Sequence, residues 1–237
     1  MTALDKANFT DVMTGIAKKL EKDPHHRLLS WDHAWQHWQK FSDSATGDED
    51  LAALHLAFYL ASWGMFRGST ALLQRDYKVL VPVVHLLKPK ATEQWTDRFF
   101  QDDKDVDAVA DEIRKLADEL TAVLKTSLIQ PGEASKQITP SDTLLSKILL
   151  NTLGCVPAFD TEVKAALNAI LGKFPATGDG FRRPNLIMTI NLARQNQKLL
   201  EEGQALFEKH REIKYPLTKI FDLYLWHYVQ TLPKPSP

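Results

Sequence analysis

Apolar residues recur every three to four positions along most of the chain, which is the spacing of one face of an α-helix. No segment shows the sustained alternation of apolar and polar residues that is typical of a half-buried β-strand. The pattern therefore predicts an all-α fold of about eight helices. The expected helices cover residues 9–20, 31–41, 51–66, 106–124, 141–153, 160–171, 186–208 and 217 onward.

Residues that begin or end helices stand at several of these boundaries. Pro24 should stop the first helix, and Ser30 is placed to cap the second. Gly154 suits the end of the helix over 141–153, and Asp160 suits the N-cap of the next helix.

Residues 130–140, QPGEASKQITP, hold two prolines and a glycine between helical segments. This composition predicts a boundary between an N-terminal helical lobe, residues 1–129, and a C-terminal helical lobe, residues 141–237. A single domain over residues 1–237 is the alternative.

Composition and charge exclude some classes of partner. The 237 residues are 44% hydrophobic and 25% charged, as in an ordinary globular protein. A net charge of −1 gives no general attraction to nucleic acid or acidic lipid, so such binding would need a local basic patch. The longest run without a charged residue, 51–66, has sixteen residues, fewer than the roughly 20 that span a bilayer. We therefore expect a buried core helix there and no membrane partner.

Cys155 is the only cysteine, which excludes an internal disulfide and a multi-cysteine metal site. The N-terminal residues show no basic segment followed by an apolar core, as a secretory signal would. Both features predict a cytoplasmic protein.

His33 and His37 are four residues apart, so they share one helix face in the way that two zinc-binding imidazoles do. Trp31, Trp35 and Trp38 fall on the opposite face, which should turn toward the core. Without a zinc motif around them, the histidines are expected to be solvated, and we expect neither a metal nor a cofactor.

Two arginine-containing segments are candidates for anion binding. Arg67 stands in an apolar stretch, where a buried guanidinium needs either a carboxylate such as Asp76 or a bound anion. The internal ion pair is the favoured alternative. In GDGFRRP, residues 178–184, flexible glycines precede Arg182 and Arg183, which could clamp a phosphate in an otherwise ordinary loop.

A corner between two helices is the most distinctive segment: KILLNTLGCVPAFDTEVKAAL, residues 147–167. Lys147 and Asn151 lie on the narrow arc that the apolar residues of the first helix leave uncovered. Asp160 begins the second helix, where a carboxylate accepts a backbone hydrogen bond worth about 1 kcal/mol. The open question is whether Asp160 only caps this helix or also performs catalysis.

The corner resembles the helix-hairpin-helix DNA glycosylase superfamily, over about residues 139–172. The resemblance lies in LLNTLG, a short turn and DTEV at a helix start. It implies an all-helical enzyme, a nucleic-acid partner, and Asp160 as the carboxylate that helps a damaged base leave its sugar. The glycine-rich hairpin of that superfamily is replaced here by EASKQITP, and its lysine nucleophile would fall near Leu144.

Three stretches together resemble a family of uncharacterised bacterial all-helical proteins: SWDHAWQHW, ALHLAFYLASWGMFRGSTALLQRDY and KILLNTLGCVPAFD. This resemblance implies a bacterial, cytoplasmic protein. If the three stretches meet in space, one cleft would be surrounded by Trp63, Arg67, Asp76, Lys147 and Asp160.

Two functions follow. The first is a binding or regulatory protein with an arginine-lined pocket for an anionic ligand or partner, and Asn151, Arg182 and Arg183 are further candidate ligand residues. The second is base excision that uses Asp160. We place the first ahead, because an aspartate that caps a helix after a proline turn is common. The sequence carries no sign of an oligomeric state.

Overall fold

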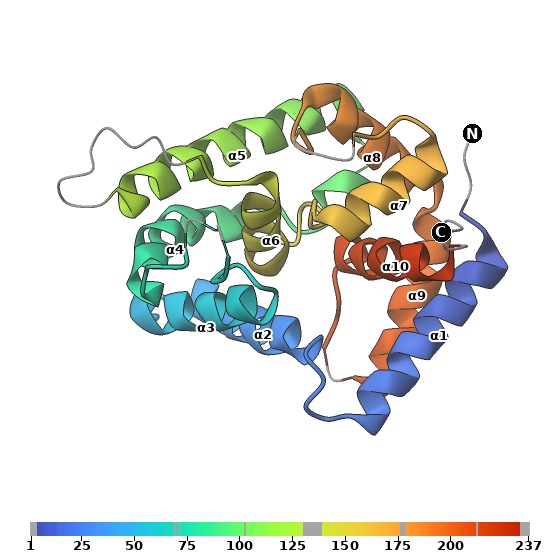
Figure 1. Ribbon diagram of the computed structural model, residues 1–237, viewed down its shortest axis with the longest axis horizontal. Helices are drawn as coiled ribbons and strands as arrows, with labels where there is room; N and C mark the ends of the chain where they lie inside the picture. The colour runs from blue at the N-terminus through green and yellow to red at the C-terminus, as the bar shows by residue number, and fades with distance from the viewer. Residues whose placement is uncertain are drawn as a thin grey trace.

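The computed structural model describes residues 4–68, 70, 72–101, 103–129, 139–175, 179–211 and 213–232. Within these ranges it has ten α-helices, three 3-10 helices and no β-strand, which confirms the all-α fold (Figure 1). The α-helices are α1 (Lys6–Lys22), α2 (Leu29–Ser42), α3 (Glu49–Ser62), α4 (Val81–Leu87), α5 (Val106–Leu128), α6 (Asp142–Thr152), α7 (Thr161–Leu171), α8 (Arg183–Gln195), α9 (Gln197–His210) and α10 (Leu217–Thr231). The 3-10 helices are η1 (Tyr77–Leu80), η2 (Pro89–Glu93) and η3 (Arg98–Phe100).

Several helices begin and end where local chemistry predicts. Helix α1 ends just before Pro24. Helix α6 is capped by Ser141 and is followed by Gly154, whose positive φ of 60° suits glycine. Asp160 caps α7 by accepting a hydrogen bond from Val163 N at 3.1 Å.

Two expected helix boundaries were wrong. Helix α2 begins at Leu29, and Ser30 lies buried inside its first turn instead of capping it. The long helix expected over 186–208 is two helices, α8 and α9, interrupted at Asn196. The buried Asn196 amide donates to Leu192 O and accepts from Leu4 N. These two hydrogen bonds fix the Asn196 side chain at the break between the helices.

Helix α6 lies near the centre of the molecule in Figure 1, with α5 above it, α3 below it, and α7 and α10 to one side. It packs on α2, α3 and α5, while α7 packs on α10, and α1 packs on α9 and α10. Hydrophobic residues from all these helices form a buried core cluster. Of the expected lobe boundary at 130–140, residues 130–138 lie outside the described ranges, and the division into lobes stays a prediction.

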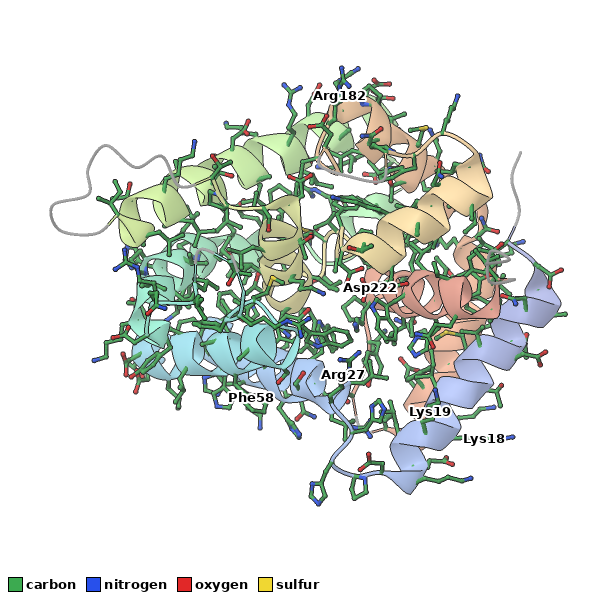
Figure 2. The ribbon with its side chains drawn as sticks, viewed as in Figure 1. Lys18, Lys19, Arg27, Phe58, Arg182 and Asp222 are labelled. Atoms are coloured by element: carbon green, nitrogen blue, oxygen red, sulfur yellow. The ribbon has the colours of Figure 1, made fainter. Side chains whose placement is uncertain are left out.

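We expected the uncharged segment 51–66 to form a buried helix, but the helix there is shorter and only partly buried. Helix α3 ends at Ser62, and one of its faces exposes Leu51, Leu54 and Phe58, which are 41%, 45% and 57% accessible. Figure 2 shows Phe58 on the outer side of the molecule. No helix in the part of the chain that the structure describes combines the length and apolar character required to cross a membrane.

A buried carboxylate ties α2 to the segment before α10. Asp32 accepts hydrogen bonds from the Tyr215 hydroxyl at 2.8 Å and from Arg211 Nη2 at 2.7 Å. Burial raises the pKa of Asp32, although the hydrogen bond from Tyr215 and the charge of Arg211 oppose this effect. This cluster fixes the C-terminal part of the chain against the N-terminal part.

Candidate functional site

A pocket of about 480 Å³ lies where the end of α3 meets the first turns of α6 and α7. Its lining includes four of the five residues that the sequence grouped around one cleft: Trp63, Arg67, Lys147 and Asp160. We call it the α3–α6–α7 pocket. Three separated parts of the chain build it, together with Arg27 and Trp226.

Two tryptophans form an aromatic wall of this pocket. Trp63 follows the last turn of α3, and its ring meets that of Trp226 edge to face, with centroids 5.6 Å apart. The guanidinium of Arg27 lies 4.8 Å from the Trp63 ring centroid and 5.5 Å from that of Trp226. Lys147 Nζ also lies 4.8 Å from the Trp63 centroid. These distances allow cation–π attraction, so the two rings hold positively charged groups beside the pocket.

Arg67 is exposed, so the expectation of a buried guanidinium that needs an internal ion pair was wrong. Its side chain folds over Gly64, where an added Cβ would lie 2.5 Å from Arg67 Nε. Gly64 and Gly68 both have positive φ, so these glycines form a turn that presents Arg67.

Asp76 is not among the residues that line the pocket. It is exposed and caps η1 by accepting a hydrogen bond from Lys78 N at 2.9 Å. No ion pair between Asp76 and Arg67 is found among the described residues.

Lys147 and Asp160 form an ion pair at the floor of the pocket. Lys147 Nζ donates to Asp160 Oδ2 at 2.9 Å, and the two side chains are only 4% and 15% accessible. Lys147 and Asn151 on the narrow arc of α6 are thus buried, as are the apolar residues of the helix. Asp160 therefore has two structural contacts, since its Oδ1 caps α7. Asn151 lies one turn further along α6, where its amide donates to Trp31 O at 3.1 Å, and it does not line the pocket.

The first turns of two eleven-residue helices face the pocket. Ser141 and Thr143 of α6, and Asp160, Thr161 and Glu162 of α7, all line it. The backbone N–H groups of a first helical turn have no partner within the helix, and they carry the positive end of the helix dipole. Ser141 and Asp160 each already accept a hydrogen bond from one of these N–H groups, and the remaining first-turn N–H groups favour an anion in this pocket.

A smaller cavity of about 10 Å³ adjoins the pocket and shares Trp63, Lys147, Asp160 and Trp226 with it. We call it the inner cavity. A second buried ion pair lines it, in which Lys219 Nζ lies 2.8 Å from Asp222 Oδ2. Figure 2 shows Asp222 on α10, near the centre of the molecule.

Tyr59 also lines the inner cavity and is 2% accessible. Burial, followed by the charges of Asp222 and Asp160, raises the pKa of Tyr59 well above its ordinary value. The phenol therefore stays protonated at neutral pH and remains a hydrogen-bond donor.

Arg182 and Arg183 lie elsewhere, beside α5 and α8, and Figure 2 shows Arg182 far from Arg27. Arg183 Nη2 is 2.5 Å from Asp107, and its Nε is 3.0 Å from Asp111. Two carboxylates on α5 thus hold Arg183, so it is poorly placed to clamp a phosphate. Arg182 is exposed at the start of α8, and Gly178 of the expected loop lies outside the described ranges.

The histidine pair has a different arrangement from the one expected. His33 is exposed, but His37 is half-buried and stacks on His55 of α3, with ring centroids 4.0 Å apart. Burial lowers the pKa values of both stacked imidazoles. Within the described ranges, no group of three or more His, Cys, Asp and Glu side chains is arranged to hold a metal ion.

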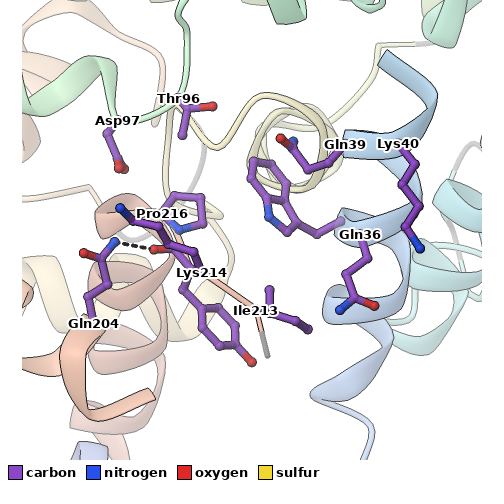
Figure 3. Close-up of a pocket in the computed structure, with 11 residues that line it drawn as sticks. Gln36, Gln39, Lys40, Thr96, Asp97, Gln204, Ile213, Lys214 and Pro216 are labelled. Atoms are coloured by element: carbon purple, nitrogen blue, oxygen red, sulfur yellow. Dashed lines mark hydrogen bonds between the residues drawn. The ribbon is translucent and has the colours of Figure 1, made fainter. Parts of the chain in front are cut away.

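Figure 3 shows a second pocket, of about 490 Å³, between α2 and the segment that leads into α10. Two of its polar side chains have partners in the fold: Gln204 donates to Tyr215 O at 2.5 Å, and Asp97 accepts from Thr218 N at 3.0 Å. Burial raises the pKa of Asp97. Lys40 and Lys214 also line this pocket, but its described lining has no arginine and no pair of helix starts, so it offers an anion fewer donors in fixed positions than the α3–α6–α7 pocket does.

Several residues of the site were not predicted from the sequence, among them Arg27, Tyr59, Lys219, Asp222 and Trp226. A signal existed for Lys219 and Asp222, which are the only charged residues in the otherwise apolar α10, LTKIFDLYLWHYVQT. Arg27 stands in a short polar turn and gives no such signal.

Comparisons with protein-family models, with curated proteins and with solved structures found no match for the chain.

Proposed function

We propose that the protein binds a small organic anion in the α3–α6–α7 pocket. The observation that carries this proposal is the convergence of Arg67, Arg27 and two helix starts on one cavity. Guanidinium groups and first-turn N–H groups are the donors that bind phosphate and carboxylate groups in proteins.

The charges that line the pocket support an anion. Its cationic residues are Arg27, Arg67 and Lys147, and its acidic residues are Asp160 and Glu162. Because Lys147 and Asp160 neutralise each other, the remaining charges of the lining are those of two arginines and one glutamate. Both arginines are exposed and therefore accessible to a ligand.

The size and the aromatic wall support a small molecule. A volume of about 480 Å³ lies within the range of roughly 300–1,000 Å³ that is usual for small-molecule sites. The rings of Trp63 and Trp226 offer apolar contact to the carbon part of the ligand.

Isothermal titration calorimetry with ethyl, propyl and butyl phosphate tests the proposal. We expect saturable binding that weakens as salt rises, because part of the attraction is electrostatic. Arg67→Ala should weaken binding about 5- to 10-fold, since one charge-assisted hydrogen bond is lost.

Arg114→Ala is the matched control, because Arg114 is exposed on α5 and does not line the pocket. It should bind the phosphates as the unchanged protein does. The absence of binding to any of the three phosphates, or equal losses in both variants, would contradict the proposal.

Base excision is the second candidate, and one observation favours it. Asp160 is a partly accessible carboxylate in a pocket walled by two indole rings, against which an extruded base could stack. Against it, both carboxylate oxygens already accept hydrogen bonds, from Lys147 and from Val163 N.

Fluorescence anisotropy with an intact duplex and with a duplex that contains an abasic-site analogue separates the candidates. Excision predicts tighter binding to the abasic duplex that persists at near-physiological salt. Weak binding that salt removes equally from both duplexes would exclude excision and leave Asp160 as a structural residue.

A further inference from the structure

The Tyr59 side chain is buried, but its hydroxyl group has no evident role in stabilising the fold. The residue is 2% accessible, and no hydrogen bond of its hydroxyl is found among the residues that the structure describes. Buried hydroxyl groups normally have a partner, because leaving one without costs free energy. An unpaired one at a cavity wall points to a missing ligand group or a water molecule.

The inner cavity that Tyr59 lines is electrically balanced. Lys147 pairs with Asp160 at 2.9 Å, and Lys219 pairs with Asp222 at 2.8 Å. Asp222 Oδ1 also accepts from Ala158 N at 2.9 Å. An added ion would meet two positive and two negative groups, so the cavity favours an uncharged group that donates and accepts hydrogen bonds.

The size of the cavity limits that group to about one heavy atom. Its volume of about 10 Å³ is near the minimum for one water molecule, roughly 10–15 Å³. Because Trp63, Lys147, Asp160 and Trp226 line both spaces, the inner cavity lies directly beside the larger pocket.

We propose that the inner cavity is the deep end of the ligand site, where the Tyr59 hydroxyl binds an alcohol group of the organic anion. This inference rests on the proposed function and narrows the ligand to a hydroxylated anion. Arg67 and the helix starts hold the charged group, and Tyr59 selects for the alcohol.

Matched phosphate pairs test this inference. The pairs are ethyl and 2-hydroxyethyl phosphate, propyl and 3-hydroxypropyl phosphate, and butyl and 4-hydroxybutyl phosphate, and each differs by one hydroxyl. At the chain length that reaches the inner cavity, calorimetry should show about 5- to 10-fold tighter binding of the hydroxylated member. Tyr59→Phe should reduce that preference below about twofold and leave the affinity for the plain alkyl phosphate unchanged.

Two further variants separate this inference from the proposed function. Arg67→Ala should weaken both members of a pair equally and retain the preference. Tyr59→Phe should melt at the same or a higher temperature than the unchanged protein, because the lost hydroxyl has no partner in the described fold.

Alkyl phosphates that bind without a preference at any chain length would overturn this inference and leave the proposed function standing. A preference that survives Tyr59→Phe, or a lowered melting temperature in that variant, would also overturn it. Failure of every phosphate to bind would overturn both.

Discussion

Lys147 Nζ lies 2.9 Å from Asp160 Oδ2, across the corner that joins α6 to α7. The ammonium is almost fully buried, and its neighbours are the carboxylate and the ring of Trp63. Asp160 is more accessible than Lys147 and also caps α7. The pair is therefore asymmetric: the buried Lys147 charge loses more free energy without its partner than the more accessible Asp160 charge does.

This asymmetry predicts that Asp160→Asn is destabilising. Asparagine still caps a helix, but it leaves the buried Lys147 charge without its carboxylate. We expect a loss of about 3 kcal/mol in the free energy of unfolding, measured by urea denaturation. Lys147→Met should cost less, because Asp160 keeps its bond to Val163 N. Equal losses of less than about 1 kcal/mol in both variants would show that the pair is not buried in solution.

Tyr215→Phe should be destabilising because Asp32 is buried and loses a hydrogen-bond donor. A loss of about 1–3 kcal/mol is expected in the same assay. Tyr77→Phe is the control, since it removes the same group from Asp50 at the surface and should cost less than about 0.5 kcal/mol. Losses of similar size in the two variants would contradict the proposed difference in burial.

His227 should make stability depend on pH. Burial lowers its pKa from 6.5 to about 4, so between these values the unfolded chain binds a proton that the folded chain does not. This contribution to stability is fully present above pH 6.5 and is lost as the pH falls toward 4, by up to about 3 kcal/mol.

His227→Gln removes this titration and tests its sign. His37 and His55 act in the same direction, so the variant should show a shallower loss of stability below pH 6.5 and not a flat one. Unfolding free energies measured at a series of pH values provide the check. Identical slopes in the variant and the unchanged protein would exclude His227 as the source.

Cys155 should be unreactive in the native protein. It is fully buried, and burial raises the pKa of its thiol to about 12, which leaves almost no thiolate at neutral pH. An aromatic disulfide reagent should therefore react with it only at the rate of unfolding, and rapidly in urea. Fast reaction of the native protein would contradict the buried position of the corner.

Local chemistry in the sequence predicted the parts of the fold that depend on neighbouring residues. The caps at Ser141 and Asp160 and the turn at Gly154 depend on backbone groups within a few positions. Arg67 shows the limit, because its apolar surroundings in the sequence suggested burial. Two glycines with positive φ instead turn the chain and leave Arg67 exposed.

The site is harder to predict because it depends on which helices meet. Periodicity places Tyr59 on a face of α3, and Lys219 and Asp222 on faces of α10, but it gives no partner for any of these faces. Trp63, Arg67, Lys147 and Asp160 do lie on one pocket, whereas Asp76, Asn151, Arg182 and Arg183 do not line it. The contacts and positions that keep the latter four residues out of the pocket are visible only in the tertiary structure.

The most direct test of anion binding follows the indole N–H signals by nuclear magnetic resonance while butyl phosphate is added. The chain has six tryptophans, of which Trp63 and Trp226 line the α3–α6–α7 pocket and Trp35 lines the second pocket. We predict saturable shifts of the Trp63 and Trp226 signals, with the Trp35 signal unchanged. Shifts confined to Trp35, or none in any indole signal, would contradict this prediction.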